Sequence, residues 1–198
     1  MNSRVAARVS LVLGLLLAIA AVTQVVASQT ATPAKGERFT AVLVNLNIPG
    51  GANAQPIDIT INRWSTDAER DALINTILEA DQKRALDVLQ KMPSIGNIRS
   101  PQSIGYDLRF ATRTSGANGS ERVLIVTDRP IGFWEAREAP RSIDYPFTVI
   151  ELQINSNGRG DGKMTVGTKI TADREERTIV LENYSVQPVM LNDVRRSK

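Results

Sequence analysis

Apolar residues recur at every second position along most of this chain, and at helical spacing in one stretch only. Residues 39–46 are apolar on both alternating sets of positions, which is typical of a strand that is covered on both faces. Residues 57–64 alternate isoleucine with polar side chains, which indicates a half-buried strand. A stretch rich in glycine and proline separates the two segments, so we expect them to pair as a hairpin with a long loop.

The period changes at Thr66, where a helix is expected to begin. Thr66 and Glu69 have the spacing of a capping box, in which each side chain accepts a hydrogen bond from the backbone N–H of the other residue. Apolar residues then recur at helical spacing as far as Met92, with a polar interruption near Ala80 and Asp81. The pattern predicts a two-helix insertion at about residues 66–92, after the second strand.

Strand patterns return after the helical stretch, separated by turn residues such as Asn118-Gly119. They cover residues 104–111, 122–127, 147–154, 162–171, 178–184 and 186–194. Pro188 lies in the last of these, which predicts an edge strand because proline cannot donate to a strand ladder. Together the patterns predict an α+β fold: an antiparallel β-meander that forms a curved sheet or partial barrel, with the two-helix insertion after its second strand and an N-terminal signal helix before it.

The first 27 residues have the features of a signal peptide in the required order. Arg4 and Arg8 precede an uninterrupted apolar run at residues 11–22, and small residues follow it. We therefore expect export and cleavage near Ala27/Ser28, which gives a secreted or periplasmic protein. The competing interpretation is an uncleaved anchor, and only then would the protein contact the membrane, through this segment.

The rest of the chain divides into a linker and one domain. Residues 28–36 are mostly small or polar and include a proline, which is typical of a flexible linker. Residues 37–195 are expected to form a single α+β domain, since about 160 residues are enough to bury a hydrophobic core.

Composition excludes many kinds of chemistry. The chain has 198 residues, of which 42% are hydrophobic, and it contains no cysteine and no histidine. Thiol nucleophiles, Ser-His-Asp triads, disulfides and zinc fingers are therefore excluded, and we expect neither a metal site nor a cofactor. The formal net charge is +3, and two basic residues would leave with the signal segment, so no nucleic-acid partner is expected.

Residues 128–145 interrupt the strand pattern and contain the best candidate binding site. The candidate ligand-binding residues are Arg129, Phe133, Trp134, Arg137 and Tyr145. They combine aromatic and cationic groups within one long loop of a chain that is only 5% aromatic, and binding groups tend to collect in such loops. The alternative is structural, with the aromatic pair closing one end of the sheet and the charges forming surface ion pairs.

Glu135 and Asp144 in the same loop are candidate catalytic carboxylates. Glycoside hydrolysis uses two carboxyl groups about 5 to 10 Å apart in a cleft, and Arg129 or Arg137 would orient the substrate. A chain with 21 acidic residues contains such pairs by chance, so an enzyme is the less favoured interpretation.

Residues 155–163 are rich in glycine and contain the tripeptide Arg159-Gly160-Asp161, which also occurs in cell-adhesion loops. A calcium loop would need oxygen ligands at alternate positions, and Arg159 interrupts that series. A plain hairpin turn is the favoured interpretation of this segment.

Three hypotheses for the function follow from these observations. The first is a non-enzymatic exported domain that binds a small apolar or amphiphilic ligand, or an envelope protein as partner. The predicted architecture resembles secreted antiparallel barrels that hold apolar ligands, which implies a ligand of that kind. The second is a histidine-free hydrolase, and the third is an interaction module that adds a partner strand to the exposed edge at residues 186–194.

Overall fold

The computed structural model describes residues 35–46, 53–79, 82–101, 103–129, 131, 147–166, 169–173, 178–182 and 188–197, all within one unit of the chain, Thr32–Lys198. The predicted signal segment at residues 1–27 lies outside the described residues, as do residues 28–34 of the predicted linker. The first strand already includes Lys35 and Gly36, which the sequence pattern assigns to the linker. Within the described ranges, no helix is both long and apolar enough to cross a membrane.

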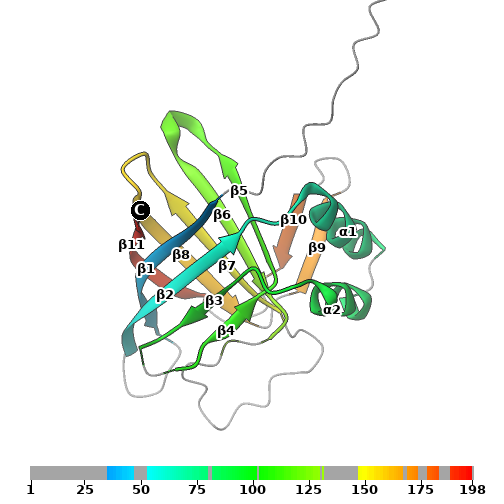
Figure 1. The fold of residues 1–198 in the computed structure, drawn as a ribbon, viewed down its shortest axis with the longest axis horizontal. Coiled ribbons are helices and arrows are strands. Elements are labelled where there is room, and N and C mark those ends of the chain that lie inside the picture. Colours follow the sequence, from blue (N-terminus) through cyan, green and yellow to red (C-terminus); the bar gives the residue numbers. More distant parts are fainter. Residues whose placement is uncertain are drawn as a thin grey trace, which may run out of the picture. The chain divides into compact units, whose positions relative to one another are not determined.

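Nine of the described strands form one antiparallel sheet, in the order β4-β3-β2-β1-β11-β8-β7-β6-β5 (Figure 1). Their bounds are β1 (Lys35–Asn45), β2 (Asn53–Arg63), β3 (Gly96–Arg99), β4 (Tyr106–Leu108), β5 (Phe110–Ser115), β6 (Glu121–Thr127), β7 (Thr148–Ile154), β8 (Arg159–Val166) and β11 (Val189–Ser197). Two further strands, β9 (Lys169–Asp173) and β10 (Thr178–Glu182), pair with each other as a separate hairpin. The first and last strands of the chain are thus neighbours in the middle of the large sheet.

The sheet curls until its two edge strands meet. β4 and β5 are consecutive in the chain and are separated only by Arg109, whose backbone N–H donates to the carbonyl oxygen of Val126 in β6 at 3.0 Å. The stretch from β4 to β5 therefore pairs with β3 on one side and with β6 on the other. Thr127 supports this seam by donating its hydroxyl to the carbonyl oxygen of Asp107 at 2.8 Å. The result is a nearly closed, barrel-like sheet, which confirms the predicted α+β class and curved sheet.

Alternate residues of the strands point inward and pack into one contiguous apolar cluster. The cluster includes Phe39, Leu43, Ile57, Ile59, Ile61, Ile98, Leu108, Val123, Ile125, Ile150, Leu152, Met164, Leu191 and Val194. All of these side chains are buried, and most have no exposed surface. The period-two pattern of the sequence therefore marks the barrel interior, and burial of this cluster provides the main stabilisation of the fold.

Two helices follow β2 and pack on the outer face of the sheet: α1 (Asp67–Leu78) and α2 (Gln82–Lys91) (Figure 1). The predicted capping box is present, because Thr66 Oγ1 accepts from the N–H of Glu69 at 3.2 Å and Glu69 Oε2 accepts from the N–H of Thr66 at 2.8 Å. A second apolar cluster joins the helices to the sheet and contains Leu73, Ile77, Ala85, Leu89, Met92, Phe110, Val126, Phe147 and Val149. The predicted junction of the helices at Ala80 and Asp81 lies outside the described residues.

The prediction that residues 186–194 form an edge strand is wrong. β11 lies between β1 and β8 and pairs with both of them. Pro188 immediately precedes the strand, so its missing N–H removes no hydrogen bond from either ladder. The free edge that strand addition requires is therefore absent from β11.

Other strand predictions differ from the structure in detail. The sequence pattern does not indicate β3, which has only four residues and follows the stop signal of α2. Residues 104–111 are predicted as one alternating strand, but Ile104 is fully exposed and the chain breaks at Arg109. As a result Leu108 packs inside the barrel, whereas Phe110 packs beneath the helices. The predicted strand at residues 162–171 is divided between β8 and β9.

Candidate functional site

Of the predicted site residues, the structure describes only Arg129. This residue is exposed just beyond β6, and its carbonyl oxygen accepts the Thr148 hydroxyl at 3.0 Å. The other predicted residues lie outside the described ranges: Phe133, Trp134, Glu135, Arg137, Asp144 and Tyr145. Ligand binding by this loop, and hydrolysis by its carboxylates, therefore stay predictions.

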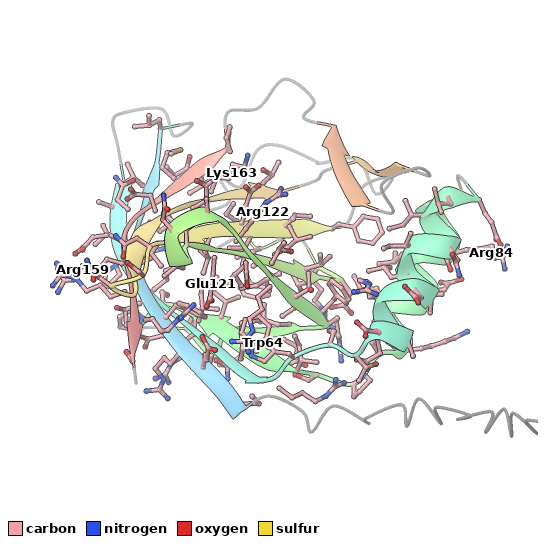
Figure 2. The ribbon with its side chains drawn as sticks, turned by 90° about the horizontal axis from the view of Figure 1, so that it is seen from above. Trp64, Arg84, Glu121, Arg122, Arg159 and Lys163 are labelled. Atoms are coloured by element: carbon pink, nitrogen blue, oxygen red, sulfur yellow. The ribbon has the colours of Figure 1, made fainter. Side chains whose placement is uncertain are left out.

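The described residues form a different candidate site, an open groove of about 510 Å³. Strands β6, β7 and β8 line it together with Met190 of β11, and the tips of the β5–β6 and β7–β8 hairpins lie at one end. The charged side chains that line the groove are the cations Arg122, Arg159 and Lys163 and the carboxylates Glu121, Glu151 and Asp161. Figure 2 shows Arg122 and Lys163 close together, with Arg159 farther along the sheet.

Glu151 is a buried carboxylate on the outer face of β7. Its neighbours Ile150 and Leu152 belong to the inner apolar cluster, so the alternation of the strand directs Glu151 outward. Its side chain is only 7% exposed, and its two oxygens contact two different cations. Arg122 Nε donates to Oε1 at 3.0 Å, and Lys163 Nζ lies 3.3 Å from Oε2. The three strands thus place a carboxylate between two cations.

The charge state of Glu151 follows from two opposing effects. Burial of the carboxylate acts to raise its pKa. The hydrogen bond from Arg122 and the positive charges of Arg122 and Lys163 outweigh burial, and they hold the pKa below its ordinary value of 4.5. Glu151 is therefore ionised at neutral pH.

The two cations are much more exposed than the carboxylate between them. The side chain of Arg122 is 56% exposed and that of Lys163 is 46% exposed. Among the described residues, Glu151 engages only Nε of the guanidinium, so the two terminal NH₂ groups remain available to a further acceptor. Arg159, a third cation of the groove, is also exposed. An anion in the groove would therefore meet guanidinium and ammonium groups, with the carboxylate beneath them.

The tripeptide Arg159-Gly160-Asp161 belongs to a strand and not to a loop. Arg159 and Gly160 lie in β8, each opposite a residue of β11, and Gly160 also lies opposite a residue of β7. The hairpin turn lies at residues 155–158, where the N–H of Gly158 donates to the carbonyl oxygen of Asn155 at 2.9 Å. The predicted hairpin is confirmed, and the tripeptide has the paired backbone of a sheet.

An exposed apolar strip adjoins the groove on the outer face of β11, β1 and β2. We name this surface the apolar strip. It consists of Met190, Val42, Val44, Ala54 and Pro56. Among the described residues, four large hydrophobic side chains are exposed, and Val42, Met190 and the adjacent Leu46 are three of them. Met190 lies directly opposite Lys163, so the strip begins where the cations of the groove end.

A second charged cluster lies inside one end of the barrel, and its charges pair with one another. Glu37 accepts Arg113 NH1 on Oε1 at 2.8 Å, and its Oε2 lies 3.0 Å from Arg196 Nε. Arg196 also pairs with Glu121 of β6. The guanidinium of Arg113 lies over the ring of Trp64, 5.1 Å from its centre. We assign this network to closing the end of the barrel.

Across the described ranges, no group of three or more acidic side chains is placed to hold a metal ion. No protein-family model matches this chain, and no curated protein and no solved structure matches it either.

Sequence reasoning missed the groove, although one signal of it is visible. Glu151 is the only charged residue among residues 147–154, an otherwise strongly apolar segment. A lone carboxylate in such a strand needs a partner, because an unpaired buried charge is very costly. The partners come from β6 and β8, and the register that aligns them is not apparent from their positions in the sequence.

The pKa of Glu151 predicts a pH dependence of stability. A carboxylate whose pKa is lowered by folding stabilises the protein above its unfolded pKa, and this contribution is lost as the pH falls through the folded pKa. We expect wild type to lose more free energy of unfolding than Glu151→Gln between about pH 7 and about pH 3. Urea unfolding of both proteins at each pH measures the difference, in which the other carboxylates cancel. Equal losses would contradict the role given to Glu151.

Proposed function

We propose that this protein is a non-enzymatic binding domain of the cell exterior or periplasm, and that it holds a small anionic amphiphile in the outer groove. The observation that carries the proposal is the pair of exposed cations, Arg122 and Lys163, held over the buried carboxylate of Glu151. Export is supported by the signal-peptide pattern of the first 27 residues.

The arrangement suits binding better than a purely structural ion pair. An ion pair that only stabilised the sheet would need one cation for one carboxylate, whereas here two cations share Glu151, so that this three-residue cluster has one more positive than negative charge. The carboxylate orients both side chains, which lowers the entropy that a ligand must remove when it binds them. The apolar strip beside Lys163 provides surface for the apolar part of an amphiphile.

The test uses the fluorescent anion 8-anilinonaphthalene-1-sulfonate, which carries a sulfonate on an apolar ring system. The variant R122Q/E151Q/K163Q removes both cations and the carboxylate, so that no buried charge is left without a partner. We expect its affinity for the dye to be at least about tenfold lower than that of wild type, since two charge-assisted contacts are lost. Fluorescence titration measures the affinity.

The matched control is E79Q/R84Q/K91Q, which removes the same three charges from the helical region. Arg84 pairs with Glu79 there, and Figure 2 shows Arg84 on a helix away from Arg122 and Lys163. We expect this control to bind the dye as wild type does. The single variant E151Q is expected to bind more tightly than wild type, because removing a negative charge beneath the bound anion outweighs the lost orientation of the two cations. Equal affinities in all four proteins would refute the site.

A further inference from the structure

We infer that the ligand is a single-chain anionic amphiphile whose head lies between Arg122 and Lys163 and whose tail crosses the apolar strip from β11 to β2. This inference rests on the proposed function and adds the ligand class and its orientation. It is carried by the register of five neighbouring strands, which places Glu151, Lys163 and the apolar side chains in one row, with Arg122 of β6 beside it.

The row follows directly from the strand pairing. Glu151 of β7 lies opposite Lys163 of β8, and Lys163 lies opposite Met190 of β11. Met190 in turn lies opposite Val44 of β1, and Val44 lies opposite Ala54 of β2. Opposite residues of an antiparallel sheet share a face, so this row runs along the outer surface from charge to apolar surface.

The length of the row indicates the length of the tail. Neighbouring strands are about 4.8 Å apart, so three spacings from Lys163 to Ala54 cover about 14 Å, or roughly eleven or twelve methylene groups of an extended chain. Val42 and Pro56 lie opposite each other beside this row and widen the strip at its far end. A twelve-carbon chain therefore fits the strip from end to end.

The apolar strip has solvent-exposed apolar side chains that a ligand can contact. Met190 is 40% exposed and Val42 is 38% exposed, whereas the described methionines Met92 and Met164 are buried. Elsewhere in the described part of the nine-stranded sheet, apolar side chains of this size are buried or half-buried, inside the barrel or beneath the helices. A tail across the strip would remove Met190 and Val42 from water.

Methionine-methyl NMR tests the inference, with dodecanoate as the probe below its micelle concentration. In the full chain labelled at the methionine methyl carbons, we expect dodecanoate to shift the signal of Met190 and to leave those of Met92 and Met164 in place. Octanoate should bind at least about tenfold more weakly, because four methylene groups are lost from the strip. Dodecyltrimethylammonium, with the same chain and the opposite charge, should not shift Met190.

Two variants locate the tail and the head separately. V44T/M190Q keeps the size of both side chains but makes the strip polar, and we expect calorimetric titration, which does not need the Met190 signal, to show that it binds dodecanoate no better than octanoate. R122Q/E151Q/K163Q should abolish the preference for dodecanoate over dodecyltrimethylammonium. The folded state of each variant is checked by the unchanged signals of Met92 and Met164.

The outcomes separate this inference from the proposed function. If the dye binds in the groove and dodecanoate leaves Met190 unshifted, the path of the tail is wrong and the proposed function stands. If neither probe binds, both proposals are refuted. If the protein binds vesicles of anionic phospholipid but not dissolved dodecanoate, the apolar strip contacts a membrane surface and the inference is overturned.

Discussion

Replacing Asp128 with alanine is expected to lower the free energy of unfolding by about 3 kcal/mol, since it removes the buried carboxylate that pairs with Arg109 and leaves this cation only the exposed carboxylate of Asp107. The side chain of Asp128 is 6% exposed and lies 3.4 Å from Nε of Arg109, which is itself 19% exposed. Arg109 separates β4 from β5 at the seam of the barrel, and its NH1 donates to the carbonyl oxygen of Met92 at 3.3 Å. The pair therefore joins the seam to the end of α2. Urea unfolding measures the loss.

Asp107 provides the matched control, because it also pairs with Arg109. Its side chain is 59% exposed, and its carboxylate lies 3.8 Å from NH2 of Arg109. Exposed pairs contribute little, so Asp107→Ala is expected to change the free energy of unfolding by less than about 0.5 kcal/mol. If the two alanine variants lost the same amount, burial of the Asp128 pair would not be what stabilises the seam.

The sequence predicts well those features that depend on neighbouring residues. The capping box of Thr66 and Glu69 needs only a spacing of three, and the structure has both of its hydrogen bonds. The alternation of Ile57, Ile59 and Ile61 likewise marks the face of β2 that points into the barrel. In both cases the physical cause lies within one turn of helix or one strand.

Features that depend on distant residues are not predicted. The first and last strands pair in the middle of the sheet, and no local signal distinguishes this from an edge for β11. Pro188 indicates an edge only if it lies inside the strand, and the exact start of a strand is not apparent from the residue pattern. The break between β4 and β5 at Arg109, which sends Leu108 and Phe110 to different faces, likewise interrupts an alternation that looks regular in the sequence.

The candidate site shows the same division. Aromatic and charged residues at 128–145 can be recognised in the sequence because they cluster within one loop. The groove cannot be recognised in this way, because its residues come from three separate strands. Arg122 and Glu151 are 29 positions apart, and they meet only because β6 and β7 pair in the observed register. A buried carboxylate of this kind becomes a recognisable site only when its partners on neighbouring strands are known.

A methyl group at Gly160 is expected to cost about 3 kcal/mol of stability and to distort the groove that Gly160 helps to line, because overpacking against backbone cannot be relieved by a rotamer change. The added carbon would overlap the carbonyl oxygen of Gln153, and Gly160 pairs with Ile154 there, so β7 and β8 would have to separate. Gly116→Ala, at the other hairpin of the groove, is the control, since its nearest neighbour is the side-chain hydroxyl of Ser120, which can rotate away, and not backbone. We expect Gly160→Ala to weaken both folding and dye binding and Gly116→Ala to leave both nearly unchanged. Urea unfolding measures the stability of both variants, and dye titration measures their binding. A Gly160→Ala protein with wild-type stability would show that the close approach of β7 and β8 does not shape the groove.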